Sequence, residues 1–370
     1  YSASATFING TSFDWLIKQA MHLFLGLIVL YTVHRLPFKI IGTLTVVLQP
    51  IMLGLLLYTL LQGREMGGAN ASRWVEIPFV GVSFQTSAAA SLILLIWIAR
   101  WLSIPRELSS FLQLWPILTQ IGLTCLLILP ADLSTAALLF AMSMLLLFIG
   151  QIPWKYLLSI GGLGVAFVGI FILFVLAFPG VSNRLDTWKS RLVNYGSANT
   201  EASYQADLAK MAIAEGEFLG KGPGKSVSKY TLPQSNSDFV FAIITEEYGL
   251  VGATLLIVIY IAIFRRMFKL AYRATSKFGT LLVIASSSGM MMQAAVNMGV
   301  SSGLLPVTGQ TLPLLSAGGS SIWMTCAAFG VVLSVSHGDI EWRNETKGKE
   351  NWDEEPVEEA LANAAETAER

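Results

Sequence analysis

Long apolar stretches recur along almost the whole chain, and polar segments separate them. Several are long enough to cross a hydrocarbon core of about 30 Å, because about 20 helical residues suffice. The apolar positions are continuous rather than alternating, which favours membrane helices over the strands of a barrel. The pattern predicts an all-α polytopic membrane protein. Its nine transmembrane helices are expected at about 15–33, 39–61, 85–102, 112–130, 134–149, 157–178, 239–264, 279–300 and 318–336.

The short loops predict the orientation of these helices. Lys and Arg residues gather at one end of successive spans, and the positive-inside rule assigns that end to the cytoplasm. The N-terminus then lies outside, and the chain begins without Met, so we expect an upstream helix and ten spans in the intact protein. The basic residues that set this orientation are Arg35, Lys39, Arg100, Arg106, Lys155, Arg265, Arg266, Lys269, Arg273 and Lys277.

The opposite face receives three longer polar segments, 62–84, 179–237 and 301–317. The large extracytoplasmic loop 179–237 carries seven Lys or Arg against five Asp or Glu, a small positive excess. Two interpretations stay open: an ordinary solvated surface, or a cationic basin at the outer leaflet for an anionic ligand such as a lipid phosphate. Apolar residues at 204, 208, 211 and 212 have helical spacing and predict an amphipathic helix able to lie on the outer membrane surface.

The amino-acid composition supports a membrane protein and distinguishes the C-terminal tail from the rest of the chain. Hydrophobic residues make up 54% and charged residues 13% of the chain, which is far from a soluble protein of this length. Residues 337–370 carry eleven acids against four Lys or Arg, so we expect an acidic cytoplasmic tail after a transmembrane domain that covers 1–336. The sequence has no nucleic-acid signature. Its two Cys and three His residues are widely spaced, which argues against a disulfide framework and a protein-built metal site.

Three acids stand where the long outer loop meets the seventh apolar run. Asp238, Glu246 and Glu247 lie in the stretch 233–249, and charge at the edge of a bilayer is costly enough to suggest function. The alternative is a solvated helix start, with Ser235, Ser237 or Asp238 as the N-cap. If 239–264 is one helix, it is about 39 Å long and projects outward, which places Asp238 in water or headgroups. Glu246 then lies about 12 Å deeper, so we expect structural or cavity-lining roles for the two glutamates.

The glycine-rich segment Gly220–Ser226 resembles a nucleotide phosphate loop only in part. The motif requires Gly where this chain has Leu219, and the segment lies on the outer side, so an ATPase is excluded. Two weaker interpretations stay open: a turn whose backbone N–H groups and Lys225 face a phosphate, or a plain flexible loop.

Three further stretches have both structural and functional interpretations. Arg73 and Trp74 suit either ordinary interfacial residues or, for Arg73, a grip on a phosphate. Asp132 is predicted mainly as an N-cap of the following helix. The segment 297–321 is rich in Gly, Pro and Ser, and such irregular backbone near a membrane is expected only where it lines a cavity.

These residues together resemble one family. The chain is similar to the SEDS proteins (FtsW/RodA), most like FtsW of Bacteroidetes-type bacteria. The likeness covers nearly the whole chain apart from the tail. It rests on the blocks at 1–4, 70–74, 84–87, 130–135, 204–205, 220–226, 237–249, 303–309 and 315–321.

The chain departs from the family pattern at several positions. A family block with Pro, Glu and Lys reads Thr86, Ala88 and Ser91 here, so no role of that Glu or Lys transfers. Gln234 and Asn236 replace the family's Glu and His before Asp238, with effects that the sequence does not decide. The remaining departures are Asn70 and Ala317.

The resemblance implies a peptidoglycan glycosyltransferase that polymerises lipid II on the outer face of the cytoplasmic membrane during cell division. Asp238 would be the general base. Because pyrophosphate leaves without an acid, one carboxylate is sufficient. The implied substrate-binding residues are Arg73, Trp74, Gln85, Ser87, Gln205, Lys225, Ser226, Ser237, Thr308, Ser316, Gly318, Gly319 and Ser320.

The resemblance also implies partners, namely a class B penicillin-binding protein, other divisome proteins and membrane lipids. It assigns no cofactor, although a pyrophosphate substrate is compatible with Mg²⁺ or Mn²⁺. Two alternatives remain at this stage, a lipid II flippase or transporter and a non-catalytic divisome scaffold. The family's two roles, division and elongation, are separated only by a thin margin around 224–229.

Overall fold

The computed structural model describes residues 12–62, 74–77, 82–105, 111–177, 201–233 and 235–338. Within this part of the chain, eight helices are long and apolar enough to cross a membrane, and a ninth is apolar but shorter. The prediction of an all-α polytopic membrane protein with nine spans is therefore confirmed. The spanning helices are α1 (Ser12–Arg35), α2 (Phe38–Gln62), α3 (Thr86–Ser103), α4 (Trp115–Ile128), α5 (Leu133–Ile149), α6 (Trp154–Ala177), α10 (Val240–Arg273), α11 (Lys277–Ser301) and a last helix, Gly319–Gly338.

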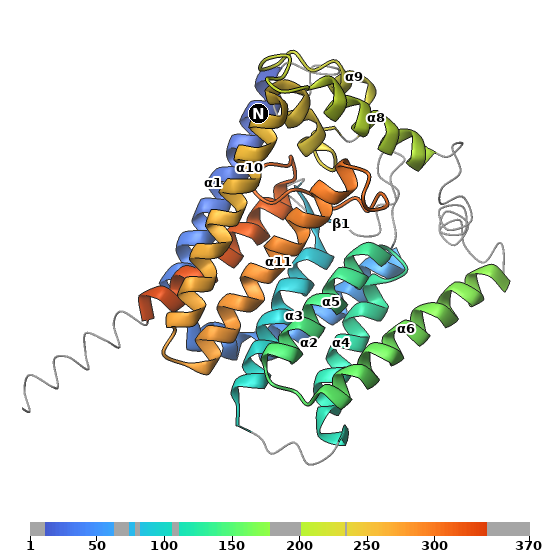
Figure 1. Cartoon of the computed structure of the whole chain (residues 1–370). Helices are drawn as coiled ribbons and strands as arrows, with labels where there is room; N and C mark the ends of the chain where they lie inside the picture. The colour runs from blue at the N-terminus through green and yellow to red at the C-terminus, as the bar shows by residue number, and fades with distance from the viewer. Residues whose placement is uncertain are drawn as a thin grey trace, which may run out of the picture.

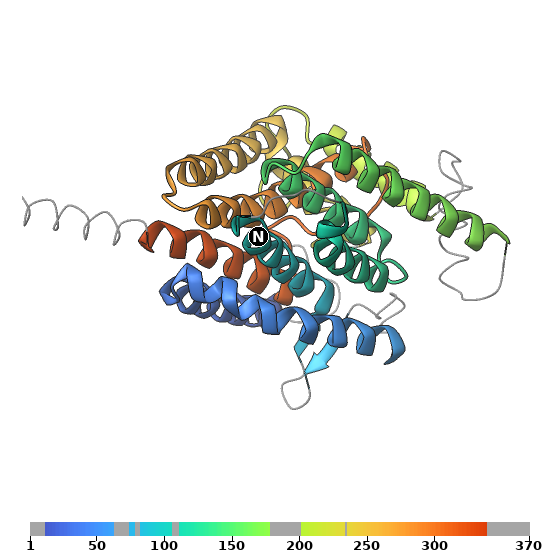
Figure 2. The same cartoon turned by 90° about the horizontal axis from the view of Figure 1, so that it is seen from below.

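The helices form a bundle in which α3, α11 and the last helix are the most buried spans. α10 packs along α11, and α11 packs against α3 and α5. α1 and α6 are mostly exposed, and Figures 1 and 2 show α6 at the edge of the bundle. Such exposure of apolar residues is expected where lipid, rather than protein, surrounds a helix.

Local sequence explains where several helices begin. The Asp132 carboxylate accepts a hydrogen bond from the backbone N–H of Thr135 at 3.1 Å, which makes it the N-cap of α5, as predicted. Ser276 caps α11 in the same way, through the N–H of Gly279. Pro116 stands in the first turn of α4, where its missing N–H costs nothing.

Two short strands were not predicted. β1 (Trp74–Ile77) and β2 (Val82–Gln85) pair antiparallel, with Trp74 opposite Gln85. β2 leads directly into α3, so the hairpin fixes the outer end of that helix. Arg73 lies outside the described residues, as do 178–200 of the large loop and 339–370 of the tail.

α8 (Glu201–Glu215) and α9 (Ser228–Thr231) sit at one end of the bundle, beside the start of α10 (Figure 1). The predicted amphipathic helix is α8. Its buried side packs on protein rather than on lipid, since Ala209 and Ala212 join a core with Phe239 and Ile243 of the chain around the start of α10.

α10 is broken near its start, which corrects the prediction of one continuous helix. Gly249 has φ +66° and ψ −167°, outside the helical region, so α10 consists of a short segment before Gly249 and a long one after it. A Cβ at Gly249 would collide with the backbone of Phe218 and Gly220, so the crossing of these two segments requires glycine. The depth argument for Glu246, which assumed a straight helix, therefore does not hold.

Candidate functional site

Asp238 lies immediately before α10, at the α8 end of the bundle. It is half-buried, and its carboxylate faces the loop that follows α11, because a Cβ at Gly309 would lie 3.4 Å from Asp238 Oδ2. Gly309 has φ +69°, a conformation that favours glycine and lets the loop approach this closely. The predicted base is thus placed against the Gly/Pro/Ser-rich stretch.

Side chains from α11 and from this loop hold the main chain around Asp238. The Asn297 amide donates to the carbonyl of Asp238 at 2.8 Å and to the carbonyl of Gln310 at 2.6 Å, so one buried side chain joins both segments. The Ser316 hydroxyl donates to the carbonyl of Ser237. The N–H of Ala317 donates to the carbonyl of Asn236 at 2.8 Å. Asp238 therefore sits on a rigid support.

A hydrogen-bonded chain extends from this support to α5. The Gln310 amide donates to Thr135 Oγ1 at 2.8 Å, and Thr135 donates to the Asp132 carboxylate at 2.6 Å. Asp132 is buried and also caps α5, so this carboxylate anchors one wall of the site.

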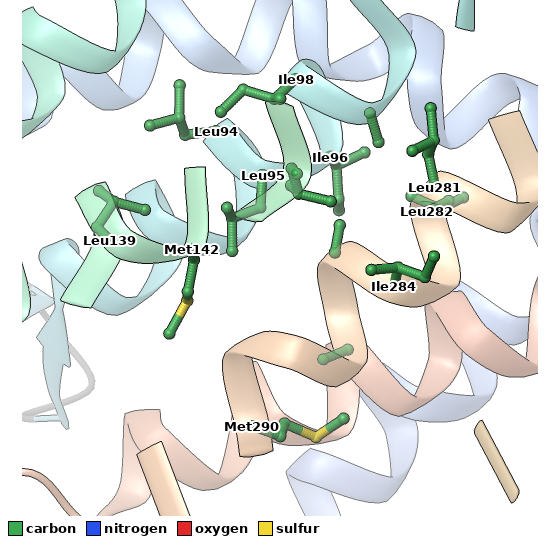
Figure 3. Close-up of a cluster of buried hydrophobic side chains, with 14 of the residues drawn as sticks. Leu94, Leu95, Ile96, Ile98, Leu139, Met142, Leu281, Leu282, Ile284 and Met290 are labelled. Atoms are coloured by element: carbon green, nitrogen blue, oxygen red, sulfur yellow. The ribbon is translucent and has the colours of Figure 1, made fainter. Parts of the chain in front are cut away.

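A cavity of about 120 Å³ lies between α3, α5, α11 and the last helix, and it reaches Gly309, the residue that faces Asp238. Gly309 and Gln310 line it next to the base, and Gln85 and Ser91 line it from α3 and the strand before it. None of the described side chains that line it is charged. Ala88 and Ser91 stand where the family pattern has Glu and Lys, which explains part of this neutrality. Figure 3 shows residues of its apolar wall, Leu95, Leu139, Met142 and Met290.

The structure groups some of the predicted substrate-binding residues around Asp238 and separates others. Ser237 and Ser316 are in the support itself, and Thr308 precedes Gly309 with its buried hydroxyl oxygen unpaired among the described residues. Gln85 and Ser87 lie across the cavity at the start of α3, where the Gln85 amide donates to the Ser87 hydroxyl at 3.3 Å.

The start of the last helix holds three more of these residues, Gly318, Gly319 and Ser320. The ring of His22 in α1 lies against Gly319 so closely that a Cβ there would overlap it. Ser320 is buried. Gly319 therefore allows α1 to pack closely against the start of the last helix.

The remaining predicted residues lie on the α8 side. Gln205 is half-buried on α8, and Lys225 is exposed. Ser226 is buried and donates its hydroxyl to Glu246. Trp74 is in β1, paired with Gln85.

Glu246 and Glu247 form a second polar centre that sequence reasoning had not connected to the glycine-rich turn. Both are buried, with 0% and 1% exposure. Glu247 accepts from the N–H of Gly224 at 2.8 Å, and Glu246 accepts from the N–H of Val227 at 3.0 Å and from Lys221 Nζ at 2.8 Å. The N–H groups of the turn therefore face the protein's own carboxylates, so the alternative in which they face a phosphate does not describe this structure.

The charge balance of this centre is also internal. The pKa of Lys221 is raised above its ordinary value. The largest cause is the hydrogen bond from its ammonium to Glu215, and the second is the hydrogen bond to Glu246. Lys229 is buried and donates from Nζ to the carbonyl of Gly224 at 2.6 Å. The structural role expected for the two glutamates is supported by these contacts, although the reason is the captured turn and not depth in the membrane.

Asn297 and Gln310 are the functional-site residues that the sequence did not single out. The available signal was Asn297, an amide inside an apolar helix just before a Gly/Pro/Ser-rich segment. Buried amides must be hydrogen-bonded, so such a residue indicates a polar contact with a neighbouring segment. In the described residues no three His, Cys, Asp or Glu side chains are grouped to hold a metal ion. Cys125 and Cys326 are both free thiols.

The chain is similar to one protein family, to named relatives and to solved structures. Residues 1–340 match the model of the family described as cell cycle protein, which groups FtsW, RodA and SpoVE. A protein of Nitrosococcus halophilus named probable peptidoglycan glycosyltransferase FtsW is 32% identical over 352 residues, covering 92% of this chain and 86% of the relative.

Two solved structures are similar over most of their length. One belongs to work on the structural coordination of polymerization and crosslinking by a peptidoglycan synthase complex; it has a TM-score of 0.69 and 27% identity and covers 88% of this chain and 90% of that one. The other is the crystal structure of the rod shape determining protein RodA of Thermus thermophilus, with a TM-score of 0.64, 26% identity and coverage of 91% and 90%.

Proposed function

The chain belongs to the cell cycle protein family of FtsW, RodA and SpoVE and is a peptidoglycan glycosyltransferase of the inner membrane, and we propose that Asp238 is its general base. The observation that carries this proposal is the position of the Asp238 carboxylate against Gly309, a residue that lines a cavity between the spans. A base must reach the hydroxyl from which it takes a proton, and Asp238 is only half-buried, so its carboxylate is not enclosed by the protein.

The proposed reaction joins two lipid II molecules, or lipid II and a growing strand. The 4-hydroxyl of a GlcNAc residue attacks the anomeric carbon of MurNAc, and the carbon–oxygen bond to pyrophosphate breaks. Asp238 takes the proton of the attacking hydroxyl, and undecaprenyl pyrophosphate leaves with the electron pair of the broken bond. Pyrophosphate is already a good leaving group, so no second carboxylate is required.

The lining of the cavity suits the apolar part of the substrate better than its charged part. Its neutral lining offers no counter-charge to a pyrophosphate, whereas its apolar wall suits the isoprenoid chain. We propose that the polyprenyl segment nearest the pyrophosphate enters the cavity. The pyrophosphate then stays outside the cavity, and Lys225 and Arg73 are candidates to neutralise it.

The protein also needs an orientation and partners for this role. We propose that the α8 end is extracytoplasmic and that 1–336 forms the membrane domain, followed by an acidic cytoplasmic tail at 337–370. A penicillin-binding protein is the general class of partner; we propose a class B member, together with other divisome proteins.

The test is polymerisation of purified lipid II in proteoliposomes. Asp238→Ala is expected to abolish glycan chain formation while the protein remains folded by size-exclusion chromatography. Asp207→Ala is the matched control, because Asp207 is an exposed aspartate of α8 paired with Lys210. Normal glycan chains from Asp238→Ala would end the proposal.

A further inference from the structure

Two large apolar side chains are displayed at the surface of the turn that follows α8. Phe218 and Leu219 are 72% and 81% exposed. Their backbone is nevertheless fixed, because the N–H of Val251 donates to the carbonyl of Phe218 at 3.3 Å and the N–H of Leu250 donates to the carbonyl of Glu217 at 2.9 Å. A rigid turn thus presents an apolar pair that the described residues leave mostly uncovered.

This apolar pair continues the lipid-facing surface of α10. Leu250, Val251 and Leu255 are all exposed along the helix that starts at the break. Since Phe218 is hydrogen-bonded to Val251, the turn lies at the level where that surface begins.

The length of α10 locates this level relative to the bilayer. From Leu250 to Phe264 the helix has 15 apolar or small residues before Arg265, which corresponds to about 22 Å. The hydrocarbon core is about 30 Å thick. Even if Arg265 reaches about 6 Å toward the headgroups by snorkelling, the break at Gly249 remains within or at the edge of the hydrocarbon.

The hydrogen bonds of the turn agree with a position beside lipid. Irregular backbone can lie at the edge of hydrocarbon only when its polar groups are satisfied within the protein. The N–H groups of Lys221 and Gly222 donate to the carbonyls of Glu246 and Glu247 at 3.0 and 2.9 Å. Those of Gly224 and Val227 donate to the carboxylates of the same two glutamates.

We propose that the turn 216–222 is a membrane anchor, in which Phe218 and Leu219 insert into the hydrocarbon edge of the bilayer and Lys221 lies at headgroup level. The short segment of α10 before Gly249 connects this anchor rigidly to Asp238. The anchor therefore sets the height of Asp238 above the bilayer, where a lipid-linked substrate presents its pyrophosphate. This last step rests on the proposed function; the insertion itself does not.

The depth of the turn can be measured by spin labelling in nanodiscs. Labels are placed at Leu219→Cys, at Leu255→Cys as a lipid-facing reference and at Lys225→Cys as an exposed polar reference, with Cys125 and Cys326 replaced by alanine. We expect the label at 219 to be accessible to oxygen and protected from a water-soluble nickel chelate, like that at 255. If the label at 219 is as accessible to the chelate as the label at 225, the turn is not a membrane anchor. The same result is expected if a partner protein, rather than lipid, normally covers Phe218 and Leu219, so it would overturn the proposal in that case too.

The functional arm compares variants in the same bilayer. Phe218→Ser/Leu219→Ser is expected to lower the rate of lipid II polymerisation about tenfold or more, because small misplacement of a catalytic group is costly. Val227→Ser, a matched exposed apolar residue, should keep the wild-type rate. An unchanged rate in the double variant would overturn the role in positioning Asp238. Asp238→Ala should leave the depth at 219 unchanged, so a failure of the proposed base is distinguishable from a failure of the anchor.

Discussion

Asp238 and the pair Glu246–Glu247 belong to one short stretch of chain, but they lie in different surroundings. Asp238 is half-buried and faces Gly309, which lines a cavity, and its main chain is held by Asn297. The two glutamates are fully buried, and hydroxyl, ammonium and backbone donors of one turn surround them. A carboxylate enclosed by its own protein stabilises structure, whereas a half-buried one beside a cavity is able to meet a substrate.

Asp238→Asn is expected to have the largest effect on the polymerisation rate, and it tests the catalytic side of this contrast. Removing a general base lowers rates by about 10²- to 10⁴-fold, and the amide keeps the size of the side chain. We expect a loss of polymerisation in that range with an unchanged melting temperature in detergent. A variant that loses stability but keeps its rate per folded molecule would assign Asp238 to structure instead.

Glu246→Ala should show the opposite profile. The substitution leaves the Ser226 hydroxyl and the N–H of Val227 without their acceptor, and each buried unpaired group costs about 1–3 kcal/mol. The free energy of unfolding should fall by about 3 kcal/mol or more, measured by chemical unfolding in detergent. Glu217→Ala, at an exposed position of the same turn, is the control. Unchanged stability in Glu246→Ala would contradict the structural assignment.

Asn297→Ala probes the connection between the Asp238 support and α11. Two carbonyls lose their donor, so we expect a stability loss of about 1–2 kcal/mol. Because the main chain of Asp238 is no longer fixed, the polymerisation rate should fall about tenfold beyond the loss of folded protein. Ser302→Ala, just beyond the end of α11, should affect neither quantity. A pure stability loss would show that Asn297 does not position Asp238.

The smallest effect concerns Lys221 and depends on pH. Its pKa is raised in the folded protein, so the stabilisation is fully present below its unfolded pKa and is lost as pH rises through the higher folded value. Lys221→Met should lower stability by less than about 1 kcal/mol at neutral pH, because the ammonium is partly exposed. Thermal unfolding at increasing alkaline pH should bring the two proteins together. A difference that persists at the alkaline end would contradict the ion pair.

The hydrophobic pattern predicted the nine spans because each helix must satisfy its own backbone in lipid. It missed the break at Gly249, since glycine is common inside transmembrane helices and does not interrupt an apolar run. It also missed the β1–β2 hairpin, which is short and depends on pairing between strands. The resemblance located Asp238, but the structure was required to place Gly309 beside it.

The hydrogen bonds between the glycine-rich turn and the carboxylates of Glu246 and Glu247 also could not be predicted from the sequence, because they too depend on contacts between separate segments. The partners lie about twenty residues apart, and the chain between them must turn back before they meet. Backbone N–H groups carry no sequence signature, so the same turn is compatible with a phosphate or with an internal carboxylate. Only the fold distinguishes the two.

The size of the cavity has a consequence for how the substrate moves. A volume of about 120 Å³ is somewhat smaller than an apolar cavity of about 150 Å³ that holds one benzene molecule. That is room for a short stretch of an isoprenoid chain and far too little for a whole undecaprenyl tail. If the segment nearest the pyrophosphate occupies the cavity, as we propose, most of the tail stays among the lipids. Each substrate can then arrive and each spent carrier depart sideways within the membrane plane, without being extracted from it.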